Sequence, residues 1–143
     1  MKKVIIILLS IILLISCNKS DFLDEINFEK FLLGGSGNYH NTEHTWYLDS
    51  LTINGVPFKL SIVQKQYNKT FLHNGMYTDS DGYSGNWDVL TPNELTISTK
   101  NNITGLFVTT KLKIIEINSI KFSYNLISSN GTKYDYFFKI KYE

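Results

Sequence analysis

The sequence predicts an all-β domain that closes as a single antiparallel, up-and-down β-barrel of about eight strands. The first supporting observation is composition: the 143 residues contain no Ala, the best helix former, whereas Thr, Ile, Tyr, Phe and Asn are abundant. The second is a succession of short segments of strand-like composition that are separated by tight-turn sequences. The third is length, because 143 residues are enough for one domain.

The expected strands follow one another along the chain, and most of them end at a turn signal. The dipeptides Asn54-Gly55 and Asn74-Gly75 are the clearest signals, because Asn and Gly tolerate the positive φ that a two-residue hairpin turn requires. A looser segment separates the first strand from the second. The expected strands are residues 46–53, 69–73, 76–78, 85–90, 95–98, 106–117, 120–127 and 133–142.

The segment 133–142 shows the two-residue alternation most clearly. One face carries only apolar or aromatic side chains and the other mainly charged ones, which predicts one buried face and one face in water. The predicted buried face consists of Tyr134, Tyr136, Phe138, Ile140 and Tyr142. The predicted water-facing side consists of Lys133, Asp135, Lys139 and Lys141, with Phe137 as its apolar exception.

The connections between the expected strands favour a closed barrel over a β-sandwich, which would fit the number of strands nearly as well. Sequential hairpins with no long crossover are typical of up-and-down barrels. The interior of an eight-stranded barrel is just wide enough to be filled by side chains or to hold one small ligand.

The amino-terminal segment has the plan of a secretory signal. Two lysines after Met1 precede an apolar run at residues 4–15, which is too short to span a membrane comfortably. The small residue Ser16 then precedes Cys17, so we expect residues 1–16 to be a signal peptide. An ordinary cleaved signal with an incidental cysteine and an uncleaved signal anchor are the alternatives.

Residues 14–17 resemble the lipobox of bacterial lipoproteins, in which the cysteine becomes the first residue of the mature chain. The cysteine sulfur takes a diacylglycerol group, and each acyl methylene buried in a bilayer contributes about 0.8 kcal/mol. Cys17 is therefore the predicted lipidation site, and its acyl chains make a membrane the predicted partner. By resemblance to the sorting scheme of enteric bacteria, Asn18 permits delivery to the outer membrane, at its periplasmic leaflet or at the cell surface.

Residues 17–40 are expected to form a tether with a short helix, and residues 41–143 the barrel. The apolar side chains at 22, 23, 26, 28, 31, 32 and 33 have partly helical spacing, and Gly34 and Gly35 end the pattern. The apolar face of this helix is expected either to pack across a mouth of the barrel or to belong only to the tether.

Several segments that follow the lipobox are similar, in order and spacing, to the lipocalin-like lipoproteins of Gram-negative bacteria. The resemblance depends on a Trp-x-Leu…Asn-Gly opening and a Gly-x-Trp in mid-chain, and it covers the signal and residues 32–98. It implies a small lipocalin-like barrel that its lipid fastens to a membrane, with no settled ligand and no catalytic residues. The segments are residues 32–36, 45–55, 69–71 and 79–87.

Composition and motifs argue against several functional classes. The chain has 14 Lys, no Arg and 13 acidic residues, so it lacks both a strong positive charge and the guanidinium fork that reads nucleic acids. The sequence shows no arrangement of Ser, His and Asp typical of a catalytic triad, no nucleotide-binding glycine loop and no Cys-His pair. We therefore expect neither an enzyme nor a cofactor. A single cysteine excludes an internal disulfide.

Two short motifs contain metal-ligand residue types. His40 and His44 are four residues apart, which suits zinc only on a helix, and this stretch is expected to be a loop. Asp79 and Asp81 alternate as calcium ligands do, but the third ligand and the later Glu of an EF-hand loop are missing. We therefore predict no metal site, and an ordinary hairpin loop at residues 79–82.

Aromatic residues are the candidates for ligand contact. Trp46 and Trp87 could line an apolar cavity, but we favour the interpretation that they fill the core at the closed end of the barrel. Inward-facing tyrosines would carry hydroxyls that need partners, which suits either an amphipathic ligand or an interior that bonds to itself. The candidate ligand-binding residues are Trp46, Trp87, Tyr134, Tyr136 and Tyr142.

The sequence leads to two functional hypotheses. In the first, a non-enzymatic, lipid-anchored lipocalin-like barrel, expected to be a monomer, binds a small apolar or amphipathic molecule. In the second, a lipid-anchored barrel with a filled interior displays its loops to a protein or glycan partner. A cavity above about 300 Å³ would support the first hypothesis, and a filled interior the second.

Overall fold

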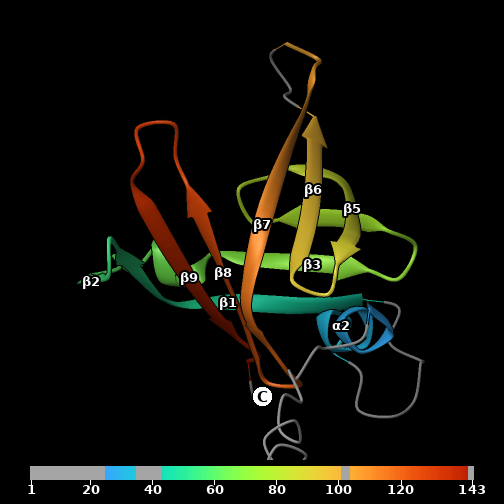
Figure 1. Ribbon diagram of the computed structural model, residues 1–143, viewed down its shortest axis with the longest axis horizontal. Helices are drawn as coiled ribbons and strands as arrows, with labels where there is room; N and C mark the ends of the chain where they lie inside the picture. The colour runs from blue at the N-terminus through green and yellow to red at the C-terminus, as the bar shows by residue number, and fades with distance from the viewer. Residues whose placement is uncertain (1–24, 35–42, 101–103, 142–143) are drawn as a thin grey trace, which may run out of the picture.

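A computed structural model describes residues 25–34, 43–100 and 104–141, which form one short helix and a nine-stranded sheet (Figure 1). A single turn of 3₁₀ helix, Gln64–Gln66, lies between β2 and β3. The elements are α2 (Glu25–Leu32), β1 (Glu43–Ile53), β2 (Val56–Phe58), β3 (Asn68–Leu72), β4 (Met76–Asp79), β5 (Ser84–Thr91), β6 (Glu94–Lys100), β7 (Phe107–Ile117), β8 (Lys121–Ile127) and β9 (Lys133–Lys139).

The sheet closes into an eight-stranded antiparallel barrel, which confirms the predicted lipocalin-like fold and excludes the sandwich. Strands β3 to β9 pair in sequence order, β1 pairs with β3, and β9 returns to pair with β1. At this seam Leu48 lies opposite Phe138, and Ile53 lies opposite Tyr134. The short strand β2 pairs with residues 51–53 of β1, beyond the residues of β1 that pair with β3, so it is not one of the eight barrel strands.

The first predicted hairpin turn is confirmed and explains the return of the chain after β1. Asn54 and Gly55 both have positive φ, 51° and 80°. This is the pattern of a type I′ turn, whose twist matches that of the flanking strands. The structure differs from the prediction in the looser segment that follows, because residues 56–58 form the additional strand β2.

The outer face of β9 departs from the predicted pattern at Asp135. This side chain was expected to lie in water, but the residue is only 7% exposed. The Thr52 hydroxyl donates to Asp135 Oδ2 at 3.0 Å, and the Lys133 ammonium lies 3.0 Å from Oδ1. The prediction failed because it used only the alternation of side chains along β9, whereas Thr52 of β1 and Lys133 on the same face of β9 provide the partners that allow a carboxylate to be buried.

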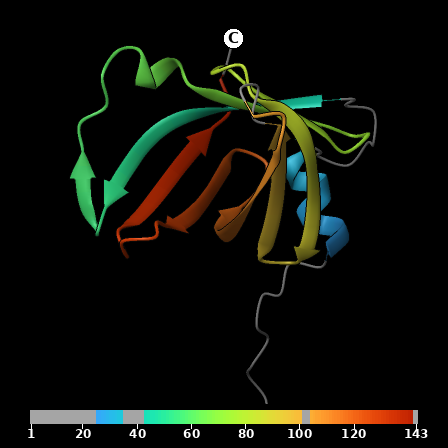
Figure 2. The ribbon, with the colours of Figure 1, turned by 90° about the horizontal axis from the view of Figure 1, so that it is seen from above.

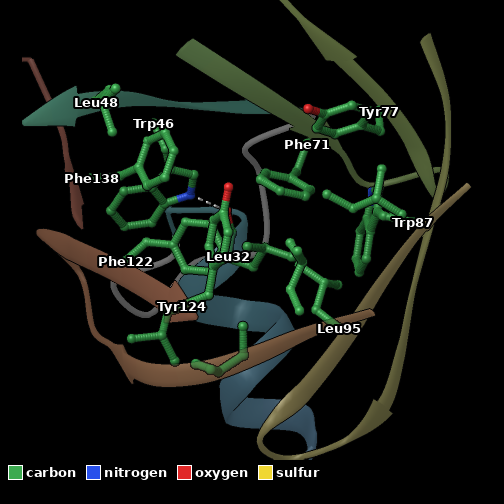
Figure 3. Close-up of a cluster of buried hydrophobic side chains, with 14 of the residues drawn as sticks. Leu32, Trp46, Leu48, Phe71, Tyr77, Trp87, Leu95, Phe122, Tyr124 and Phe138 are labelled. Atoms are coloured by element: carbon green, nitrogen blue, oxygen red, sulfur yellow. Dashed lines mark hydrogen bonds between the residues drawn. The ribbon is translucent and has the colours of Figure 1, made fainter. Parts of the chain in front are cut away.

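An aromatic cluster fills the half of the barrel near the start of β1 (Figure 3). Phe122 is at its centre and is completely buried. Its ring centroid lies 5.6 Å from that of Trp46, 5.9 Å from Phe71 and 5.8 Å from Phe138. Most of these contacts are tilted or edge-on, which are favourable geometries for aromatic pairs.

Helix α2 belongs to the same core, so its apolar face packs across one end of the barrel. Phe28, Leu32 and Leu33 are buried in the hydrophobic cluster, and α2 packs against β5 and β7. The Trp46 indole N–H donates to the Leu32 carbonyl at 2.9 Å, which ties the end of the helix to β1 (Figure 3). Figure 2 shows the helix beside the ends of the strands at this side of the barrel.

Gly34 ends the helix in a conformation that only glycine adopts readily there. Its φ is +72°, and its N–H bonds to the Phe31 carbonyl at 2.9 Å. A side chain at this position would also overlap the imidazole of His44. Helix α2 is therefore part of the folded unit together with the strands.

Candidate functional site

The half of the barrel opposite α2 contains a cavity of about 480 Å³. This volume lies within the range of small-molecule sites, about 300–1,000 Å³. The segment between β2 and β3 and the turn between β4 and β5 form part of its wall. The lining residues are Leu48, Leu51, Leu60, Val63, Gln64, Tyr67, Lys69, Tyr77, Asp79, Asp81, Tyr83, Ile97, Thr99, Thr110, Leu112, Tyr124, Leu126 and Tyr136.

Several strands contribute two lining residues that are two positions apart, because alternate residues of a strand face the barrel interior. Ile97 and Thr99 illustrate this on β6, as do Thr110 and Leu112 on β7. Most of the lining residues are apolar or aromatic. The cavity therefore combines an apolar wall with a smaller number of polar groups.

The most polar part of the wall is a hydrogen-bonded group of four residues, which we call the Lys69 cluster: Tyr67, Lys69, Tyr77 and Asp79. The Lys69 ammonium donates to the Tyr67 hydroxyl at 2.9 Å and to the Tyr77 hydroxyl at 2.7 Å. These hydroxyls donate in turn to Asp79 Oδ2 at 3.1 and 2.9 Å. Two tyrosines thus connect a buried cation to a carboxylate.

The strand register explains why these four residues meet. Tyr67 and Lys69 are two apart at the start of β3, and Tyr77 and Asp79 are two apart on β4, so both pairs face inward. Lys69 and Asp79 are direct cross-strand partners in the β3–β4 pairing. Opposite charges at such positions stabilise a strand pair.

The turn that follows β4 fixes the carboxylate of Asp79. Its Oδ1 accepts the backbone N–H groups of Asp81 at 3.1 Å and Tyr83 at 3.0 Å, and Gly82 has a φ of +85°. Residues 79–82 thus form a hairpin turn, in which both Asp79 oxygens already accept hydrogen bonds. Among the described residues, no group of three or more His, Cys, Asp or Glu side chains could hold a metal ion.

Burial changes the protonation behaviour of the cluster. Lys69 is only 8% exposed, and this desolvation lowers its pKa to about 8, although attraction to Asp79 and Asp81 opposes the shift. Desolvation also raises the pKa values of Tyr67 and Tyr77, so their hydroxyls are neutral donors at physiological pH. The ammonium lies 5.2 and 5.0 Å from the centroids of these two rings, which adds a cation–π attraction.

The structure places the candidate ligand-binding residues in different regions. Tyr136 lines the cavity and stacks on Tyr124, with ring centroids 5.1 Å apart. Tyr134 is partly buried, stacks on Tyr136 and lies outside this lining. Tyr142 lies outside the described residues.

Both tryptophans lie in the core at the end of the barrel that α2 covers (Figure 3). The indole N–H of Trp87 donates to the Leu72 carbonyl at 2.9 Å, as that of Trp46 does to Leu32. These polar groups are thus satisfied by backbone carbonyls. Neither tryptophan lines the 480 Å³ cavity, which agrees with the core interpretation favoured from the sequence.

Two further candidates from the sequence, the metal motif of His40 and His44 and the lipidation site Cys17, lie in the amino-terminal half of the chain. His44 lies at the start of β1, where its ring packs edge-on against Trp46 at 4.7 Å and burial lowers its pKa. Its predicted companion His40 and the predicted lipidation site Cys17 lie outside the described residues.

The Lys69 cluster was not predicted from the sequence, although a signal for it was present. Lys69 has the same strand phase as Phe71, so it occupies an inward position where an apolar residue is expected. Tyr67 was missed because the second strand was predicted to begin only at residue 69.

In the part of the chain that the structure describes, no helix is long and apolar enough to cross a membrane. Comparisons of the chain with protein-family models, with curated proteins and with solved structures find no match.

Proposed function

We propose that this chain is a lipid-anchored, lipocalin-like lipoprotein whose barrel binds a small amphipathic molecule without catalysing a reaction. The observation that carries this proposal is the 480 Å³ cavity, which has apolar walls and one buried polar cluster. Small-molecule sites typically have this construction, with a few polar groups that fix the orientation of the ligand. A filled barrel that served only to display its loops would lack this interior space.

A substitution that fills the cavity tests the binding function. We expect Thr110→Trp to weaken the binding of the neutral fluorophore N-phenyl-1-naphthylamine at least tenfold, because Thr110 lines the cavity and the larger ring would occupy it. The measurement is a fluorescence titration of the protein from residue 17 onward with Cys17→Ser, which retains every described element.

Thr109→Trp is the matched control, because Thr109 is the adjacent residue on β7 but is exposed on the opposite face. Its affinity should equal that of the unsubstituted protein. Equal binding by Thr110→Trp, or no binding by the unsubstituted protein, would show that the barrel interior is not a ligand site.

The proposed anchor is a set of acyl chains on Cys17, with the barrel held at the outer membrane of a Gram-negative bacterium. The support is the sequence: a basic start, a short apolar run and a lone cysteine after Ser16. Two or more acyl chains give stable anchoring where one is marginal. The proposed partners are therefore the membrane, through these chains, and the ligand in the cavity.

Radiolabelled palmitate tests the anchor. The unsubstituted chain expressed in a Gram-negative host should incorporate label and sediment with membranes, whereas Cys17→Ser should lose the label because it has no thiol to modify. Asn18→Ser is a suitable control, since it leaves the cysteine in place. Equal labelling of the Cys17→Ser chain would contradict the proposal.

A further inference from the structure

The Lys69 ammonium has an unused hydrogen-bond donor, and Lys69 lines the cavity. A protonated lysine has three N–H groups, and the hydroxyls of Tyr67 and Tyr77 accept two of them. Among the described residues, no protein atom accepts the third. A buried donor without an acceptor is costly, and more so when it is charged.

The other groups of the cluster have no comparable hydrogen-bond donor left for a ligand. Each of the two tyrosine hydroxyls accepts from Lys69 and donates its only proton to Asp79. Asp79 accepts four hydrogen bonds, two from these hydroxyls and two from the backbone of its own turn. The cluster therefore offers a donor to a ligand, and its carboxylate is already engaged.

We infer that Lys69 binds the headgroup of the ligand, so that the cavity selects amphiphiles with a single carboxylate and an apolar tail. This inference rests on the proposed binding function and specifies its ligand class. A carboxylate would accept the third ammonium proton in a charge-assisted hydrogen bond, which is shorter and stronger than a neutral one. The tail would lie against the apolar part of the wall, formed by Leu48, Leu51, Ile97, Leu112 and Leu126.

Among anionic headgroups, the charges around the cavity suit a monoanion better than a dianion. The positive charge of Lys69 is already partly balanced by Asp79 through the tyrosines, so one further negative charge can be accommodated more easily than two. Asp81 also lines the cavity, but it is exposed, where solvent screens its repulsion of an anionic headgroup. A fatty carboxylate of medium chain length meets these requirements.

Three ligands with the same chain isolate the contribution of the headgroup: decanoate, decanol and decyltrimethylammonium. Their affinities are measured by displacement of N-phenyl-1-naphthylamine from the protein from residue 17 onward with Cys17→Ser. We expect decanoate to bind about ten- to a hundredfold more tightly than decanol, as one charge-assisted hydrogen bond would produce. Lys69→Met should remove this preference while decanol binding persists.

Lys111→Met is the matched control, because Lys111 is an exposed lysine on β7 whose side chain is 68% accessible. It should retain the preference for decanoate. Equal affinity of the unsubstituted protein for decanoate and decanol, or an equal change of both in Lys69→Met, would overturn the headgroup assignment but leave the cavity function intact. A preference for decyltrimethylammonium, or failure of all three ligands to displace the fluorophore, would overturn it as well, whereas absence of fluorophore binding would refute both proposals.

The pH dependence of the unsubstituted protein gives a second readout that needs no variant. Decanoate affinity should change little from about pH 6 to pH 7, where the carboxylate is ionised, and it should fall above pH 8, because Lys69 loses its proton near its pKa of about 8. The titratable groups that face Lys69 are Tyr67, Tyr77, Asp79 and Asp81, and burial raises the pKa values of both tyrosines, so the hydroxyls stay neutral in this range. Decanol affinity should not change. A decanoate affinity that is constant from pH 7 to pH 10 would contradict the assignment.

Discussion

Replacement of Phe122 by Ala is expected to lower the free energy of unfolding by about 3–5 kcal/mol, as measured by urea denaturation. Phe122 has no exposed surface and lies at the centre of the aromatic cluster, with ring contacts to Trp46, Phe71, Tyr124 and Phe138. The loss would combine the transfer free energy of the ring with the cost of the cavity that remains. The surrounding rings belong to four strands, so the barrel cannot easily collapse around the gap.

Phe107→Ala is the control for this substitution, because Phe107 is 64% exposed at the start of β7. Its effect should stay within about 0.5 kcal/mol, as for most surface changes. Phe122→Leu, which keeps part of the volume, should fall between the two. A loss of less than about 1 kcal/mol for Phe122→Ala would mean that this cluster does not form the core.

Replacement of Lys69 by Met is expected to stabilise the protein at pH 7, by about 1–3 kcal/mol. Burial lowers the pKa of Lys69 from its ordinary 10.5 to about 8, so the folded state holds this proton less tightly than the unfolded state does. The unfavourable contribution is present in full below pH 8 and disappears as the pH rises from about 8 to 10.5. Removal of the ammonium eliminates it, although Asp79 then loses its nearby counter-charge.

The advantage of Lys69→Met should therefore shrink across the same pH interval, which denaturation at pH 7, 9 and 10.5 would measure. Lys111→Met, at an exposed lysine loosely paired with Glu94 at 3.5 Å, should change stability by less than about 0.5 kcal/mol at each pH. A Lys69→Met protein that is less stable at pH 7, or whose difference from the unsubstituted protein does not depend on pH, would contradict this account.

A lysine that costs stability while it lines a cavity is typical of a functional site. Stabilising substitutions at such positions commonly reduce activity, because the strained or desolvated group serves binding. The two Lys69 experiments are therefore expected to show opposite effects of one substitution, with higher stability and weaker carboxylate binding.

Most of the fold could be predicted because its determinants are local. Two-residue alternation indicated the inner face of β9, and Asn54-Gly55 indicated the turn after β1. Strand β2 was missed because its three residues, Val56–Phe58, are all exposed and show no alternation. The burial of Asp135 was missed for a different reason, since its partner Thr52 is 83 residues away in sequence.

The site could be predicted less well than the fold. Whether an eight-stranded barrel is filled or hollow depends on how side chains from all its strands pack together, which no single segment indicates. Tyr134 and Tyr136 illustrate this, because they share one face of β9 and only Tyr136 lines the cavity. The Lys69 cluster depends in addition on the register of β3 with β4, which places Lys69 opposite Asp79.

The seam between β1 and β9 has a consequence for the order of folding. The two strands are far apart in sequence, with Leu48 opposite Phe138. Their pairing therefore closes a much longer loop than any hairpin in the barrel. Until residues 133–139 are available, β1 and β8 each present an unpaired edge that can associate with other chains. The cavity, whose wall includes Tyr136 of β9, is therefore complete only after the last strand has been synthesised and has joined the first.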